Sequence, residues 1–305
     1  MRRYLYSFLA TYLTLMPAAG QFRENMFDAP VFNADAKIVL VPTTVLDRRG
    51  AIVSGLRADA FTVMQDNLPQ RIASFGEQDV PASLGVVFDT SGSMSGVLPE
   101  AKTVMRTFFE ASNPEDEAFL FTVASKPNRD SGFTQDFDSL VNHMVFAGAQ
   151  GSTALVDTIY AALLQSRTAH NPRKAILVIS DGMDNHSRYS ARELISAALE
   201  ADLQIYSITV YTPPMTKKPI ELREEREGMA FLEEITRRTG GVQLVVRNAH
   251  EIDQAAHDVA RAIRDQYLIG YVPEHAEANG QWHTIKIKLN VANAKAYARS
   301  GFFAK

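Results

Sequence analysis

The 305-residue sequence contains no cysteine and only one tryptophan. The absence of cysteine excludes disulfides, thiolate metal sites and cysteine nucleophiles. Basic residues form no run and the formal net charge is −4 at pH 7, which argues against a nucleic acid as partner. The chain also lacks internal repeats and low-complexity segments. It has no glycine-rich phosphate loop with a lysine, so nothing indicates nucleoside triphosphate binding. The remaining composition is that of an ordinary globular protein.

Long apolar runs are confined to the start of the chain. Arg2 and Arg3 precede the mostly apolar stretch Tyr4–Met16, and small residues follow it up to Gly20. This pattern predicts a signal peptide over residues 1–20, and hence a protein exported to the periplasm, the cell surface or the medium. A short uncleaved membrane anchor is the alternative. After the signal peptide no apolar segment is long enough to span a membrane, and residues 21–35 are predicted to be a linker or arm.

The two flanks of the chain are predicted to be rich in β-structure. Residues 36–80 contain short β-branched segments separated by turns, and residues 267–305 return to the same pattern. Because a few strands at each end would be marginally stable alone, we expect the C-terminal strands to join the N-terminal flank in one small β-rich domain.

Between the flanks, residues 81–266 alternate between buried strands and amphipathic helices. This alternation predicts an α/β fold with a doubly wound, mostly parallel sheet covered by helices on both faces. The expected strands are 84–88, 118–123, 175–179, 204–210 and 242–246, with an edge strand near 133–137. The expected helices are 97–112, 154–165, 190–200, 229–238 and 251–264, and residues 212–227 are expected to form a surface insertion.

The most informative motif follows the first strand of this α/β region. Asp89, Ser91 and Ser93 place one carboxylate and two hydroxyls at alternate positions just before a predicted helix. Ligands of open α/β sheets bind at the carboxyl ends of the strands, and hard oxygen donors there suit Mg²⁺, Mn²⁺ or Ca²⁺. Asp89 alone would more often be a helix cap, so the metal prediction depends on further residues.

Asp89-x-Ser91-x-Ser93 resembles the first motif of the metal-ion-dependent adhesion site (MIDAS) of von Willebrand factor A (VWA) domains. Gly151–Leu155 resembles the threonine loop of that family, and Ser180–Gly182 its final aspartate motif. The resemblance covers about Ser83–Gln266. It implies that one Mg²⁺ ion, with Mn²⁺ or Ca²⁺ as alternatives, is held by Asp89, Ser91, Ser93, Thr153 and Asp181. The flanking segments Gly55–Phe61 and Tyr267–Tyr271 are similar to an exported bacterial VWA-related family.

The resemblance implies a function without catalysis. A metal ion with few charged ligands and one open position would bind a Glu or Asp carboxylate of a partner protein. Behind the ligands, Asp184 and Asn185 are expected to be loop residues that could support the metal site, while Asp157 is expected to face solvent.

Three other functions compete with metal-dependent protein binding. A Mg²⁺-dependent phosphatase-like hydrolase would use Asp89 as nucleophile, but Ser91 occupies the position of its second carboxylate. A serine hydrolase is disfavoured because Met94 is central in Gly92–Gly96. The third alternative is an envelope assembly or scaffold protein with a vestigial metal site. A zinc pair of His250 and His257 on one helix face is less favoured than ordinary surface histidines.

Overall fold

The structure is a computed structural model that describes residues 38–77, 79–96, 98–142, 153–211, 219–273 and 280–304. The predicted signal peptide (residues 1–20) and linker (residues 21–35) lie outside these residues. Within the described part of the chain, no helix is both long and apolar enough to cross a membrane.

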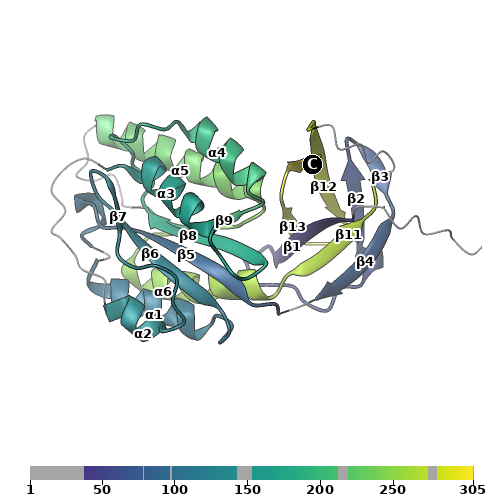
Figure 1. Ribbon diagram of the computed structural model, residues 1–305, viewed down its shortest axis with the longest axis horizontal. Coiled ribbons are helices and arrows are strands. Elements are labelled where there is room, and N and C mark those ends of the chain that lie inside the picture. Colours follow the sequence, from purple (N-terminus) through teal and green to yellow (C-terminus); the bar gives the residue numbers. More distant parts are fainter. Residues whose placement is uncertain are drawn as a thin grey trace, which may run out of the picture. The chain divides into compact units, whose positions relative to one another are not determined.

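A six-stranded sheet forms the centre of the α/β region, with strand order β10-β9-β8-β5-β6-β7 (Figure 1). Its strands are β5 (Ala82–Asp89), β6 (Glu117–Val123), β7 (Pro127–Arg129), β8 (Arg173–Ser180), β9 (Gln204–Val210) and β10 (Gln243–Val246). The strands are parallel except β7, which pairs antiparallel with β6. Every residue of β5, β6 and β9 is buried, as expected for strands that are covered on both faces.

Helices cover the two faces of this sheet in two groups (Figure 1). One face carries α1 (Ala101–Glu110), α2 (Phe137–Asn142) and α6 (Ala249–Arg264), and the other carries α3 (Leu155–Ser166), α4 (Ala191–Glu200) and α5 (Pro219–Thr239). Within β5, Val86 packs toward the first group and Val87 toward the second. The helix after β5 is α1 and the helix after β8 is α4, so the chain leaves these two strands toward opposite faces of the sheet. The position between β5 and β8 is therefore the topological switch point, where ligands of such sheets bind.

The flanks of the chain form two four-stranded antiparallel sheets, with strand orders β13-β1-β11-β4 and β14-β12-β2-β3. The strands from the N-terminal flank are β1 (Val39–Asp47), β2 (Phe61–Gln65), β3 (Leu68–Gln70) and β4 (Ile72–Glu77). Those from the C-terminal flank are β11 (Tyr267–Tyr271), β12 (Trp282–Leu289), β13 (Ala294–Ala298) and β14 (Gly301–Phe303). Both sheets mix strands from the two flanks, and their residues share one apolar cluster. The predicted fold class is confirmed.

Short 3₁₀ turns add local detail at Ala58–Ala60 (η1), Gly92–Met94 (η2) and Leu98–Glu100 (η3). Two predicted helix starts are wrong. The helix expected over 97–112 begins only at Ala101, after η3. The helix expected from Met229 begins ten residues earlier, at Pro219, so part of the expected insertion is helical. Proline is well suited to a first helical turn. The helical spacing of apolar residues was not evident here because most of the residues that follow Pro219 are charged.

The edge strand of the large sheet is also displaced from its predicted position. Of residues 133–137, Thr134 makes an isolated bridge with Ala118 and Phe137 begins α2, and the edge strand is Pro127–Arg129. The backbone groups at this bridge exchange two hydrogen bonds of 2.8 Å. Proline has no backbone N–H to donate to a neighbouring strand, so it is tolerated at the first position of an edge strand.

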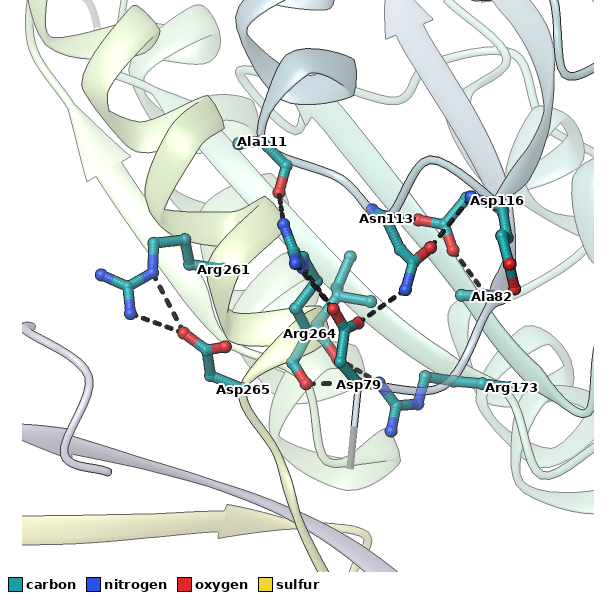
Figure 2. Close-up of polar contacts among 11 residues, drawn as sticks. Asp79, Ala82, Ala111, Asn113, Asp116, Arg173, Arg261, Arg264 and Asp265 are labelled. Atoms are coloured by element: carbon teal, nitrogen blue, oxygen red, sulfur yellow. Dashed lines mark hydrogen bonds and ion pairs between the residues drawn. The ribbon is translucent and has the colours of Figure 1, made fainter. Parts of the chain in front are cut away.

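An ion pair fixes the segment between β4 and β5 to the end of α6 (Figure 2). Arg264 donates to Asp79 Oδ2 from Nη2 at 2.6 Å and from Nε at 3.1 Å, and Asn113 donates to Asp79 Oδ1 at 3.0 Å. Burial alone would raise the pKa of Asp79, but the hydrogen bonds from Arg264 and Asn113 outweigh burial and lower this pKa below its ordinary value. The charged form of Asp79 therefore stabilises the folded chain.

We expect Asp79→Asn to lower the free energy of unfolding by about 1 kcal/mol near neutral pH, since solvent screens this partly exposed pair. Because the pKa is lowered on folding, the contribution is present above the unfolded-state pKa of about 3.9 and is lost as the pH falls through the folded-state pKa. Urea unfolding across this pH range should therefore show that wild type and variant differ in their free energy of unfolding near neutral pH. This difference should disappear as the pH falls.

Asp59→Asn is the matched control, because the Arg57–Asp59 pair is 4.0 Å long and highly exposed. It should leave stability unchanged at every pH. Equal stabilities of wild type and Asp79→Asn at neutral pH, or a difference that persists in acid, would contradict the assigned role of Asp79.

Candidate metal centre

Two carboxylates lie at the carboxyl ends of the central parallel strands. Asp89 is the last residue of β5, and Asp181 directly follows Ser180, the last residue of β8. These strands pair in parallel register with Phe88 opposite Ile179, so their ends meet at the same edge. Both Asp89 and Asp181 are fully buried, with 0% exposure.

Hydrogen bonds hold the carboxylate of Asp89 in one orientation. Its Oδ1 accepts from the backbone N–H of Ser91 at 2.8 Å, and its Oδ2 accepts from the hydroxyl of Ser180 at 2.6 Å. The Ser180 hydroxyl in turn accepts from the backbone N–H of Gly182 at 2.9 Å. Asp181 Oδ1 accepts from the backbone N–H of Met183 at 3.0 Å. The two strand ends are thus linked through their own polar groups.

The electrostatics of this pair are unfavourable without a cation. Burial, and next the neighbouring charge of Asp181, raise the pKa of Asp89 to about 6, although hydrogen bonds from Ser180 and Ser91 oppose the rise. Two like charges that share a buried site repel each other and disfavour the charged forms. A divalent cation would remove this repulsion, so the two carboxylates fit a metal ion by charge as well as by chemistry.

Two serine hydroxyls lie beside the carboxylates. Ser91 Oγ and Ser93 Oγ are 3.0 Å apart. The short turn η2 positions them, because the backbone N–H of Met94 donates to Ser91 O at 3.0 Å and the Met94 side chain is fully buried. Ser91 is buried and Ser93 is exposed. The hydroxyl pair therefore leads from the buried carboxylates to the solvent.

Thr153 precedes α3 and is fixed by the loop that follows β8. Its backbone N–H donates to Asn185 Oδ1 at 2.7 Å, and its carbonyl oxygen accepts from the backbone N–H groups of Asn185 and His186, both at 3.0 Å. The next backbone N–H, that of Ala154, donates to Ala124 O at 2.8 Å just beyond β6. Thr153 is buried, and these contacts place its segment at the same sheet edge as Asp181.

Of the residues that support the predicted ligands, the sequence pointed to Asp184 and Asn185 but not to the role of Ser180. Ser180 orients Asp89, and Asn185 fixes the backbone of Thr153. Asp184 Oδ1 accepts from Leu155 N at 3.3 Å at the start of α3. The sequence signal for Asp184 and Asn185 was the concentration of polar side chains after β8.

The expectation that Asp157 simply faces solvent is wrong. This half-buried residue accepts from the backbone N–H groups of Arg188 and Tyr189 at 2.9 and 3.0 Å, and its own N–H donates to Ser187 Oγ at 3.0 Å. Asp157 thus fastens the loop after β8 along α3.

Among the described residues, no three or more His, Asp or Glu side chains cluster in a way that could hold a metal. The candidate centre differs from such a cluster, since it combines two carboxylates with three hydroxyls. The side chain of His250 lies outside the described residues, so the alternative zinc pair stays untested. The Nδ1 of His257 lies 3.5 Å from Asp258 Oδ1.

The loop that carries Asp181 packs directly against α5 through two glycines. A Cβ atom placed on Gly228 would lie 2.1 Å from the carbonyl oxygen of Gly182, and Gly182 has a φ of +84°. Only glycine allows such a close approach of two backbones at a left-handed position. The position of α5 therefore restricts the position of the Asp181 loop.

Comparison with known proteins finds a family match over the first part of the α/β region. Residues 84–183 match the family described as von Willebrand factor type A domain. The match supports a VWA domain over these residues. No curated protein sequence matches the chain significantly.

Solved structures are similar to this chain at low sequence identity. A von Willebrand factor type A protein from Catenulispora acidiphila is 12% identical and has a TM-score of 0.51, with 90% of this chain and 65% of that chain covered. The protein BatB from Bacteroides thetaiotaomicron is 20% identical, with a TM-score of 0.47 and coverage of 59% and 98%. Proximal thread matrix protein 1 from the mussel byssus, described with a zinc-occupied MIDAS motif, is 17% identical, with a TM-score of 0.47 and coverage of 65% and 49%.

We predict that Gly228→Ala destabilises the chain. Alanine is favoured over glycine in helices by about 1 kcal/mol, but here the added methyl collides with the Gly182 backbone. Overpacking of this kind costs about 1–3 kcal/mol, so thermal unfolding should occur at a lower temperature. Gly132→Ala is the control, because a Cβ atom at that position would have no neighbouring atom within 4 Å. A Gly228→Ala variant as stable as wild type would refute the backbone contact.

Proposed function

We propose that this chain is a non-catalytic VWA domain that holds one divalent cation and uses it to bind a partner protein. The proposed ligands are Asp89, Ser91, Ser93, Thr153 and Asp181. The observation that carries the proposal is the pair of fully buried carboxylates at adjacent strand ends, next to the paired hydroxyls of buried Ser91 and exposed Ser93.

The donor set favours Mg²⁺, with Mn²⁺ and Ca²⁺ as alternatives. All five side chains offer oxygen atoms, which hard cations prefer. Mg²⁺ takes six ligands in near-octahedral geometry and readily keeps water among them, so a partner group can replace water on the exposed side, near Ser93. The two aspartates are the only charged groups of the proposed set, and the three hydroxyls add no charge.

A carboxylate is the partner group best suited to such an ion. It is the hard anionic oxygen donor that proteins themselves supply, as Glu or Asp. The proposed partner is therefore a protein that presents an acidic side chain. The export predicted from residues 1–20 would place this interaction outside the cytoplasm.

The local contacts give little support to an enzyme. Within the described part of the chain, Ser93 Oγ is hydrogen-bonded to Ser91 Oγ, and no histidine contacts it to act as a base. A phosphatase-like reaction would need an acid two residues after Asp89, where Ser91 stands. VWA domains are usually non-catalytic.

We predict that calorimetric titration of Mg²⁺ or Mn²⁺ into the chain will detect one ion per molecule. The double variant Ser91→Ala/Ser93→Ala should bind the ion at least about tenfold more weakly, because loss of even the groups behind metal ligands costs about 10–100-fold. Ser95→Ala is the matched control, since Ser95 is exposed on the same loop and is not a proposed ligand. It should bind metal as wild type does.

Two results would reject parts of this proposal. A wild-type chain without measurable Mg²⁺ or Mn²⁺ binding would reject the metal centre. Metal binding together with partner capture that is unchanged by a chelator would instead favour the scaffold alternative with a vestigial site.

A further inference from the structure

A groove lies beside the candidate metal centre, between α3 and the loops that follow β6 and β8. Its volume is about 530 Å³. The residues that characterise it are Lys126, Pro127, Tyr160, Leu164, Arg188 and Tyr189. We call it the α3 groove.

The α3 groove shares its backbone with the candidate ligand Thr153. His186, which also lines the groove, donates its backbone N–H to Thr153 O at 3.0 Å. Further along, Asp157 accepts from the backbone N–H groups of Arg188 and Tyr189. The same loop therefore borders both Thr153 and the groove, so a partner anchored at the metal lies next to this groove.

Stacked tyrosines give the α3 groove an apolar surface. The rings of Tyr160 and Tyr189 are 4.2 Å apart and inclined by only 8°. Tyr189 is 46% exposed and Leu164 is 43% exposed, although both are large hydrophobic residues. Exposed apolar surface that gathers at a concave site is typical of an interaction surface, and tyrosine is enriched in such surfaces.

The charges of the groove favour an acidic occupant. Lys126 and Arg188 are exposed, and neither side chain makes a hydrogen bond or ion pair with any other residue that the structure describes. The acid of the lining, Asp157, already accepts two backbone hydrogen bonds through Oδ1. The groove thus presents two positively charged side chains at its rim, while the carboxylate of Asp157 is occupied by hydrogen bonds within the protein.

We propose that the α3 groove binds the segment of the partner that adjoins the metal-binding carboxylate. This inference rests on the proposed function. The occupant is an acidic, extended peptide segment: its first carboxylate reaches the metal, a second acidic side chain lies between Lys126 and Arg188, and an aromatic or aliphatic side chain packs on Tyr160 and Tyr189. A volume of this size accommodates a drug-sized ligand, which corresponds to a few residues of peptide.

A displayed library of random peptides tests the groove and does not require the partner to be identified. The library is selected with Mg²⁺ on the wild-type chain, on Lys126→Glu/Arg188→Glu and on Tyr189→Ala. Lys286→Glu is the control, because Lys286 is an exposed lysine on β12 in the flanking sheets. Calorimetric Mg²⁺ titration of each variant verifies that the metal centre is intact.

On the wild type and on the Lys286→Glu control, we expect chelator-sensitive peptides with two acidic residues and a nearby aromatic or aliphatic residue. The charge-reversed double variant should bind these peptides at least about tenfold more weakly, because it opposes like charges. It should still bind Mg²⁺ and select Mg²⁺-dependent peptides with a single acid. Tyr189→Ala should lose the preference for the apolar residue.

The outcomes separate the groove from the metal centre. No Mg²⁺ binding by the wild type overturns the proposed function itself. Normal Mg²⁺ binding with the same peptide preferences on wild type and groove variants overturns the groove alone. Normal Mg²⁺ binding with no Mg²⁺-dependent peptide selected on the wild type overturns it as well.

Discussion

The repulsion between two buried carboxylates is the constraint on which the rest of the site depends. Asp89 and Asp181 end adjacent strands of a parallel sheet and are removed from water. Buried charges are costly unless they are paired and hydrogen-bonded. The Ser180 hydroxyl and the backbone N–H of Ser91 relieve Asp89 only in part, since its pKa stays raised to about 6. The fold thus maintains an arrangement that a dication would stabilise.

The metal centre and the α3 groove would contribute differently to binding. A cation that receives a carboxylate gives strength but little selectivity, because nearly every protein surface offers Asp or Glu. Rim charges such as Lys126 and Arg188 would discriminate among acidic partners and speed their approach. The stacked tyrosines would add a requirement for apolar contact. Both parts are set by one loop, which Asp157 and Asn185 fasten to α3 and to Thr153.

The sequence was sufficient to predict elements whose signal is local. Strands such as β5 and β8 are continuous apolar runs, and the ligand candidates stand at their ends, so the fold class and the grouping of these residues could be anticipated. Contacts between distant segments could not. Ser180 reaches Asp89 across 91 positions, and Asn185 reaches Thr153 across 32. The start of α5 was missed because its first residues are mostly charged and its burial depends on contacts such as Gly228 with Gly182.

The pairing of β1 with β11 also bears on the order in which the chain can fold. Val39 has Tyr271 as its partner, more than two hundred residues later. Contacts of such long sequence separation form late, because the loop must close before they are gained. The VWA region between them contains its own parallel sheet and can assemble first. During synthesis, β1 therefore emerges long before β11 and β13, the two strands between which it lies.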